Sequence, residues 1–378
     1  MKKIGMAIAA LATSMPVFQA QAENISNTKV SIYGRLDAGV TTVSNEAGGR
    51  NYRLDDGVYG ANRIGFKGEE DLGGGTQALF VLENSFSLGD GRALQGGALF
   101  GRQSYIGLRN DWGTLTLGNQ YSSLTDFLVW YTGLCASGYA FHQGSYDNVS
   151  GDRLRHSLKY QSPSMNGFRY GATYGFGSGT AQRDKGWNVG AQYEQGSASI
   201  GVGYSRHERP VGAISNPYRS TGMSSFLGQS LVSADPATGQ VVSRYSPANP
   251  FRVDRQDTWG LGGSYNFGKF TLAADTIDTR FDGYGRSSHV RVYEVSDIHQ
   301  LTERTTLAAS YQHTRAESTR WNQLSLQLSY ALSKRTTLYL SGDYLRASSG
   351  TKAVIGGVFA PSSSNKQSDL RMAVLHTF

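Results

Sequence analysis

The chain has 378 residues with 48 glycines, 22 tyrosines and 16 phenylalanines, and its mean hydropathy is −0.38. This length suits two soluble domains or one large β domain. No ordinary interior segment reaches the roughly 20 apolar residues that a membrane helix needs, so the composition excludes a protein built from transmembrane helices.

Residues 1–22 have the features of an export signal. A pair of lysines precedes an apolar stretch from Ile4 to Leu11, and Ala20 and Ala22 occupy the small-residue positions of a cleavage site. We expect cleavage after Ala22, which leaves residues 23–378. This removes two of the 36 basic residues and none of the 29 acidic ones, so the net charge falls to +5. Such a charge is too small to indicate a nucleic-acid partner.

The single cysteine restricts how the exported chain can be stabilised. Cys135 has no second cysteine with which to form an internal disulfide. An exported protein without disulfides needs another source of stability, and a closed sheet is one such source.

Apolar and polar side chains alternate along most of the mature chain. In residues 29–43, Val30 and Ile32 share one face, and Tyr33 and Arg35 take the other. The same pattern recurs to the C-terminus, with short polar or glycine-rich turns between the segments. Strict alternation over about ten residues, separated by turns, is typical of the strands of a transmembrane β-barrel.

The alternation and the turns predict sixteen strands. An even number places both chain termini at the end with the short turns, which is the periplasmic end in such barrels. The predicted strands are 30–42, 60–67, 76–87, 99–109, 114–120, 153–161, 168–176, 187–195, 198–206, 257–266, 270–280, 288–298, 304–313, 321–331, 336–347 and 368–378.

The predicted fold is therefore all-β, a 16-stranded antiparallel transmembrane β-barrel. Every backbone polar group in a bilayer must be paired within the protein, so the sheet closes on itself. The apolar faces, such as that of Leu324 and Leu326, then point outward. Gln327 and Ser329 point into a lumen that is too wide for side chains to fill. A large soluble β-sandwich is the alternative, but its tyrosines would scatter, whereas many tyrosines here lie near strand ends, as in membrane-interface girdles.

The last predicted strand ends on an aromatic carboxy-terminal residue, Phe378. Leu370, Met372 and Val374 share its parity. We interpret this ending as a signal for assembly into the outer membrane. An ordinary last strand that happens to end in phenylalanine is the alternative interpretation.

Six motifs resemble those of the general trimeric porins of Gram-negative outer membranes, in the subgroup typical of β-proteobacteria. They span nearly the whole mature chain, and their combination is far more specific than any one of them. The resemblance implies a homotrimer of sixteen-strand barrels, each with its own pore narrowed by an infolded third loop. The motifs are SIYGRLDAG (31–39), RIGFKGEEDLGGG (63–75), FGRQSYIGL (100–108), SYNFGK (264–269), SKRTTLY (333–339) and the terminal Phe378.

Two segments without strict alternation are expected to be loops. Residues 121–152 occupy the place of the family's third loop, which forms the constriction. They are rich in small and aromatic residues, whereas a free external loop of this length would usually carry more charge. Residues 207–256 contain five prolines and are expected to form a long extracellular loop.

The resemblance also implies which residues form the pore constriction. Its motifs place the basic wall at Arg35, Arg63, Arg102 and Arg153. The parity of the first two strands supports this assignment, because Arg35 and Arg63 lie opposite the apolar faces of their strands. A solvated arginine without a special role is the alternative for each position.

The acidic side of the expected constriction lies partly on the third loop. Asp126 in LTDFL matches the family's acidic position, and Trp130 stands where the family often carries a second acid. Glu83 faces the lumen by parity and is expected to balance Arg102 in part. Several arginines against one or two acids predict a water-filled diffusion channel for inorganic ions and small hydrophilic solutes with a preference for anions.

The remaining expectations concern partners and alternative functions. Partners are other copies of the chain in a homotrimer, outer-membrane lipid and lipopolysaccharide, and the permeating solutes; no cofactor or metal site is expected. An outer-membrane enzyme is one alternative, but the seven histidines form no HExxH pair and have no GxSxG partner. A solute-specific channel is another, with Trp130, Tyr131, Tyr139 and Phe141 as a short aromatic patch.

Overall fold

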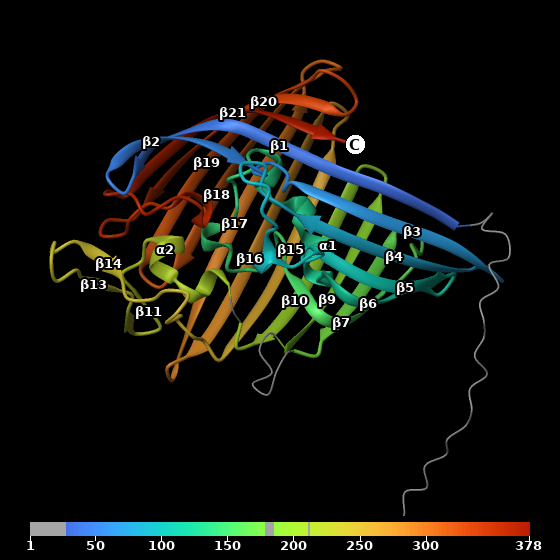
Figure 1. Ribbon diagram of the computed structural model, residues 1–378, viewed down its shortest axis with the longest axis horizontal. Coiled ribbons are helices and arrows are strands. Elements are labelled where there is room, and N and C mark those ends of the chain that lie inside the picture. Colours follow the sequence, from blue (N-terminus) through green and yellow to red (C-terminus); the bar gives the residue numbers. More distant parts are fainter. Residues whose placement is uncertain (1–27, 178–184, 211) are drawn as a thin grey trace, which may run out of the picture.

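The computed structural model describes residues 28–177, 185–210 and 212–378. The expected export signal at residues 1–22 lies outside these ranges. Figure 1 shows long strands that enclose a central space, with only short helices. Within the described residues, no helix combines the length and the apolar character that spanning a bilayer would require.

Among the described residues, the main sheet contains 17 strands, all paired antiparallel. Four further short strands there pair outside it: β11 (Ser225–Phe226) with β12 (Gln229–Ser230), and β13 (Val232–Ala234) with β14 (Val241–Ser243). The strands of the main sheet are β1 (Thr28–Glu46), β2 (Gly49–Asp56), β3 (Arg63–Gly73), β4 (Thr76–Ser85), β5 (Gln103–Asn110), β6 (Gly113–Tyr121), β7 (Arg153–Gln161), β8 (Phe168–Gly175), β9 (Lys185–Gln195), β10 (Ala198–Glu208), β15 (Arg255–Asn266), β16 (Phe270–Gly283), β17 (Arg286–Gln300), β18 (Thr305–Ala316), β19 (Thr319–Ala331), β20 (Thr336–Ala347) and β21 (Lys366–Thr377).

The sheet closes into a barrel because the first strand pairs with the last. Residues 35–43 of β1 pair with residues 369–377 of β21. On its other side, β1 pairs with β3 through residues 28–35 and with β2 through residues 38–46. Since β2 and β3 share one position around the wall, the 17 strands occupy 16 positions. The predicted fold class is confirmed.

The second position of the barrel differs from the predicted strand 60–67. The chain fills it with two strands, β2 and β3, and β3 continues through the acidic residues 69–71 beyond the predicted strand. Neither extension was predicted, because the end of β3 mixes charged and polar residues on both faces and β2 carries just two apolar side chains, Tyr52 and Leu54. Backbone pairing with β1 and β4 holds these segments in the sheet.

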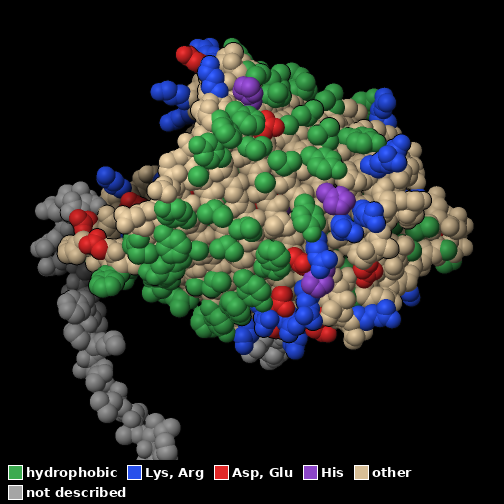
Figure 2. All heavy atoms as spheres, turned by 180° about the vertical axis from the view of Figure 1, so that it is seen from behind, with side chains coloured by type: hydrophobic (Ala, Val, Ile, Leu, Met, Phe, Trp, Pro, Cys, Tyr) green, Lys and Arg blue, Asp and Glu red, His purple; other side chains and the backbone are tan. Residues whose placement is uncertain are grey.

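The alternation in β19 has the predicted orientation. Leu324, Leu326 and Leu328 are 46%, 46% and 44% exposed on the outer face, and Figure 2 shows apolar side chains spread over the outside of the barrel. Gln327 points inward but is only 1% exposed, so the expectation that it faces open water is wrong. The inner face of the same strand contacts a chain segment inside the barrel, since Gln323 Nε2 donates to the Tyr139 backbone carbonyl at 3.2 Å.

The two ends of the barrel differ in their connections. The seven connections β3–β4, β5–β6, β7–β8, β9–β10, β15–β16, β17–β18 and β19–β20 are short, and the C-terminus lies at the same end. The opposite end carries the long connections, and Figure 1 shows β11 (Ser225–Phe226), β13 (Val232–Ala234), β14 (Val241–Ser243) and α2 (Pro217–Thr221) gathered there. This connection also contains β12 (Gln229–Ser230) and the 3-10 helix η6 (Ala213–Ser215).

The largest apolar core lies inside this end of the barrel, where long connections pack on one another and on the wall. It includes Tyr146 from residues 122–152, Phe226 and Phe251 from residues 209–254, and Phe359 from residues 348–365. Among the described residues it contains seven buried aromatic side chains, and rings such as those of Phe226 and Phe281 lie 5.7 Å apart in an edge-to-face arrangement. The connections therefore form one packed layer.

We predict that Leu326→Arg lowers the stability of the barrel by about 2–4 kcal/mol, because it places a charge at mid-strand on the apolar outer face. The free energy of unfolding in lipid vesicles, from urea titration of tryptophan fluorescence, measures this effect. Leu332→Arg is the control, since Leu332 lies in the turn after β19 and a charge there costs about 0–1 kcal/mol. Equal effects of the two changes would contradict the assigned orientation.

Candidate pore constriction

Residues 122–152 fold into the barrel between β6 and β7. They contain α1 (Ser123–Leu128) and the 3-10 helices η3 (Val129–Tyr131), η4 (Gly133–Cys135) and η5 (Gln143–Ser145). Ser122 caps α1, because its hydroxyl accepts a hydrogen bond from the Thr125 backbone N–H at 3.1 Å. Leu124 and Leu128 are fully buried against the wall. This segment is called the inner loop below.

Glycines on the inner wall make room for the inner loop. A methyl group at Gly190 would lie 2.5 Å from Phe127 Cδ2, and one at Gly262 would lie 2.5 Å from Tyr131 Cδ2. Gly201, Gly203 and Gly260 are equally close to α1 or η3 side chains or backbone. The inner loop can therefore approach the backbone of β9, β10 and β15 directly, which any side chain at these positions would prevent.

Polar contacts connect residues 123–139 of the inner loop to strands on different sides of the barrel. The Ser123 N–H donates to Asn188 Oδ1 at 2.7 Å, and the Tyr131 hydroxyl lies 2.6 Å from the Ser199 hydroxyl. Further along, the Ser137 hydroxyl donates to Asp343 Oδ2 at 2.6 Å and the Tyr139 hydroxyl donates to Asp55 Oδ2 at 2.7 Å. The loop thus crosses the lumen from β9 and β10 to the opposite wall, where it contacts β20 and β2.

The four arginines expected on the basic wall lie close together, and we name them the arginine cluster (Arg35, Arg63, Arg102 and Arg153). Arg35 and Arg63 are direct partners in the pairing of β1 with β3. Glu83 on β4 contacts two members: its carboxylate pairs with Arg102 Nε and lies 3.8 Å from Arg63 Nη1. The Tyr33 hydroxyl also donates to Glu83 Oε2 at 3.0 Å.

Tyr121 joins the other side of the arginine cluster, although the sequence analysis did not identify it. Its hydroxyl accepts hydrogen bonds from Arg102 Nη2 and, at 2.9 Å, from Arg153 Nη2. The guanidinium of Arg153 also lies 4.6 Å from the ring centroid of Tyr121, which is cation–π geometry. One aromatic side chain thus holds two like-charged groups on the same wall.

Asp126 does not pair with the arginine cluster. Its carboxylate forms an ion pair with Lys159 on β7 and accepts a hydrogen bond from Gln161 Nε2 at 2.8 Å. Burial raises the pKa of the Asp126 carboxyl, although the Lys159 ammonium offsets part of this rise. Lys159 also donates to the Tyr121 backbone carbonyl at 3.0 Å, so this ion pair borders the cluster. Parity in its strand could have identified Lys159 as an inward residue.

The aromatic residues of the inner loop divide into exposed and buried ones. Trp130 is 74% exposed, and its indole N–H donates to the Asp126 backbone carbonyl at 3.0 Å. Tyr131 and Tyr139 are buried against the wall. These residues therefore do not form the continuous aromatic patch that a sugar-specific channel would use.

Phe378 lies where the wall closes. Its backbone exchanges two hydrogen bonds with Gly34, of 3.0 and 3.2 Å. A methyl group at Gly34 would come within 2.2 Å of Phe378 Cζ, so the phenylalanine ring packs over this glycine. The last residue is thus part of the seam between the first and last strands.

We predict that Gly190→Val detaches α1 from the wall and lowers stability by about 1–3 kcal/mol, because the added atoms overlap Phe127. Limited proteolysis of the folded protein, with cleavage sites in the inner loop identified by mass spectrometry, should show faster cleavage. Gly263→Val on β15 is the control, because a methyl group there meets only the Ser199 carbonyl at 3.3 Å. Unchanged cleavage in Gly190→Val would contradict the close packing.

Comparisons with known proteins agree with this architecture. The chain is 28% identical to an outer membrane porin protein of Bordetella pertussis, over 92% of this chain and 94% of that protein. It is 27% identical to outer membrane porin protein 32 of Delftia acidovorans over the full length of both chains.

Solved structures share the fold. An anion-selective porin from Comamonas acidovorans superposes with a TM-score of 0.75 at 22% identity, covering 93% of this chain and 100% of that one. The trimer form of in-vitro folded OmpT of Vibrio cholerae gives a TM-score of 0.63 at 14% identity, covering 93% and 100%.

The family comparison covers most of the sequence. The model of the Gram-negative porin family matches residues 6–350. The chain therefore belongs to the Gram-negative porin family: it is a channel protein of the outer membrane and not an enzyme.

Proposed function

We propose that this channel prefers anions and that the arginine cluster sets the preference. The observation that carries the proposal is the charge balance on one side of the lumen. The four arginines and Lys159 contribute five positive charges, and Glu83 and Asp126 are the carboxylates that contact them. These seven groups carry a net charge of +3, and Arg35 and Arg153 have no contacting carboxylate among the described residues.

The acids of the inner loop do not reduce this excess. Asp126 pairs with Lys159, Asp147 with His142, and Asp152 with His207. Each carboxylate is thus committed to a partner outside the arginine cluster. A permeating anion is therefore attracted to the guanidinium groups, while a cation is repelled by the same uncompensated charge.

Trp130 supports a narrow passage beside this charge. Its indole is the most exposed aromatic group of the inner loop, at 74%. A bulky apolar ring at this position supplies no negative charge to attract cations. We infer that the inner loop constricts the lumen and that Trp130 reduces the cross-section of the lumen. The arginine cluster supplies the positive electric field that acts on permeating ions.

A homotrimer is the assembly that we propose. The trimer form of OmpT has the same fold, and several apolar side chains on the outer faces of β1 and β5, including Val30, Ile32 and Ile106, are well exposed in the single chain. Cross-linking of the native protein in detergent and closure of channels in steps of three would support the trimer. A uniform monomer that conducts in single steps would exclude it.

We predict that the double change Arg63→Gln and Arg102→Gln reduces anion preference. A unit charge about 4 Å from an ion is worth about 1 kcal/mol even in water, and the lost arginine changes the energies of anion and cation in opposite directions, so each lost arginine should lower the anion-to-cation permeability ratio by at least about fivefold. The reversal potential in a planar bilayer under a KCl gradient measures this ratio. Arg335→Gln in the turn after β19 is the control and should leave the ratio nearly unchanged.

We predict the opposite change for Glu83→Gln. This substitution keeps the size of the side chain but removes the carboxylate between Arg63 and Arg102, so the positive field increases and the anion-to-cation ratio should rise severalfold. The same gradient experiment applies, at low salt where screening is weak. A lower ratio, or a wild-type channel that selects cations, would refute the proposed charge assignment.

A further inference from the structure

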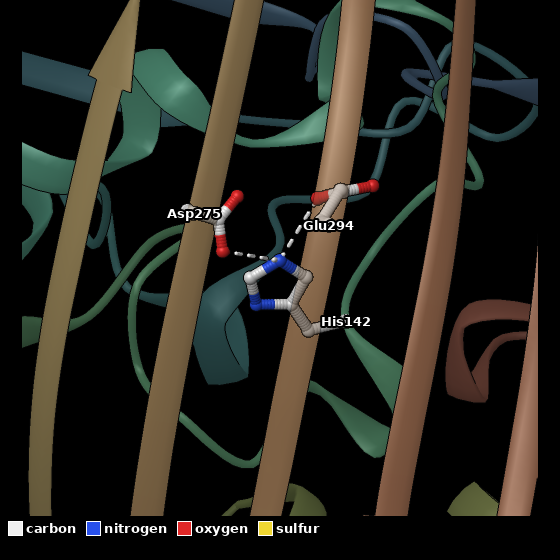
Figure 3. A group of neighbouring side chains, drawn as sticks. All are labelled: His142, Asp275 and Glu294. Atoms are coloured by element: carbon white, nitrogen blue, oxygen red, sulfur yellow. Dashed lines mark hydrogen bonds and ion pairs between the residues drawn. The ribbon is translucent and has the colours of Figure 1, made fainter.

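Three side chains of metal-ligand type meet inside the barrel, away from the arginine cluster. His142 belongs to the inner loop, Asp275 to β16 and Glu294 to β17, and Figure 3 shows both carboxylates directed toward one imidazole nitrogen. Asp275 and Glu294 are direct partners across the two strands. All three side chains are almost completely buried.

Hydrogen bonding within the protein does not satisfy these carboxylates. Among the described residues, no group donates a hydrogen bond to either oxygen of Asp275 or to Glu294 Oε1. Glu294 Oε2 accepts from the Gly133 N–H at 2.7 Å. Buried polar atoms in folded proteins almost always have a partner, and an unpartnered buried carboxylate oxygen is especially costly. The cluster therefore presents three ligand oxygens that need a cation.

The charge of the cluster indicates what kind of cation fits. Asp147 contacts the other ring nitrogen of the same imidazole, Nδ1, so three carboxylates surround one histidine. Among the described residues, no lysine or arginine is within ion-pair distance of Asp275, Glu294 or Asp147. A protonated His142 would leave two negative charges uncompensated, whereas a divalent cation with neutral imidazole leaves only one.

The geometry fits a first-row transition metal. Nε2 of His142 lies 3.0 Å from Glu294 Oε2 and 3.6 Å from Asp275 Oδ1. Ligand atoms about 2.0–2.2 Å from a tetrahedral metal ion are separated by roughly 3.3–3.5 Å, so small side-chain shifts would create the site. Asp147 at Nδ1 would then orient the ring, as carboxylates do behind metal-bound histidines.

We propose that His142, Asp275 and Glu294 bind a divalent transition metal that fastens the inner loop to β16 and β17. One imidazole and two carboxylates are the donor set that zinc and its neighbours accept, whereas calcium and magnesium favour oxygen ligands alone. A water completes the coordination at a fourth position. The metal connects the loop to the wall opposite the arginine cluster, so it stabilises the width of the passage.

Sequence spacing could not have predicted this site, and no metal site was expected from the sequence. The ligands lie at positions 142, 275 and 294, in three separate segments, and no two of them have the short spacing of a metal motif. Only the packing of the inner loop against the wall brings the histidine to the pair of acids.

Zinc binding by the folded protein tests the proposal. The full chain in detergent micelles would be treated with a chelator, dialysed and titrated with Zn²⁺, with bound metal measured by elemental analysis. We expect one zinc per chain that is bound at least tenfold more weakly in Asp275→Asn and in Glu294→Gln. Failure of the wild-type protein to bind stoichiometric zinc would overturn the proposal, as would unchanged binding in both variants.

Asp369→Asn is the matched control. Asp369 also lies across a strand pair from a second carboxylate, Asp343, and neither of its oxygens accepts a hydrogen bond from the part of the chain that the structure describes. This pair has no histidine beside it among the described residues, so Asp369→Asn should bind zinc like the wild type. A tenfold loss of zinc affinity in this control as well would overturn the proposal. It would show that removal of a buried acid weakens zinc binding by destabilising the fold and not by removing a ligand.

Cobalt provides a second measurement that does not depend on the folding of a variant. Co²⁺ bound by the wild-type chain should give the visible absorption of a four-coordinate site with nitrogen and oxygen ligands, and Zn²⁺ should displace it. A six-coordinate spectrum, as expected for loose binding to surface histidines, would contradict the proposed site.

Discussion

The structure depends on one constraint: backbone polar groups that face a bilayer must be paired within the protein. The pairing of β1 with β21 meets this constraint by removing the free edges of the sheet. Once the sheet is closed at 16 positions, its circumference leaves an interior that wall side chains alone cannot fill. The alternation of apolar and polar residues, the inner loop and the charged wall all follow from that closed, hollow shape.

The hollow interior makes the inner loop the element that determines the passage. Glycines such as Gly190 and Gly262 let α1 and η3 lie directly on the wall. The arginine cluster lies on another side of the lumen. The loop's own acids are paired with Lys159, His142 and His207, so they do not cancel the arginine cluster. The two sides of the lumen therefore differ in role. The glycine-rich wall of β9, β10 and β15 holds the inner loop, and the arginine cluster attracts the permeating anion.

Much of this could be predicted from the sequence, because period-two alternation is a strong local signal. It identified the strand faces around Leu326 and the inward direction of Arg35 and Arg63. It failed at β2 and at the end of β3, where backbone pairing holds segments whose alternation is short or absent. It also missed Tyr121, whose contact with Arg153 follows from the pairing of β6 with β7, and the cluster at His142, whose residues meet only because the inner loop packs against the wall.

The proposed anion preference requires the arginine cluster to border the conducting path. Arg63→Cys in a Cys135→Ser background, treated with anionic and cationic methanethiosulfonate reagents during current recording, tests this placement. We expect both reagents to change the current and the anionic reagent to react several times faster, because Arg35, Arg102 and Arg153 remain nearby. No reaction, or faster reaction with the cationic reagent, would contradict it.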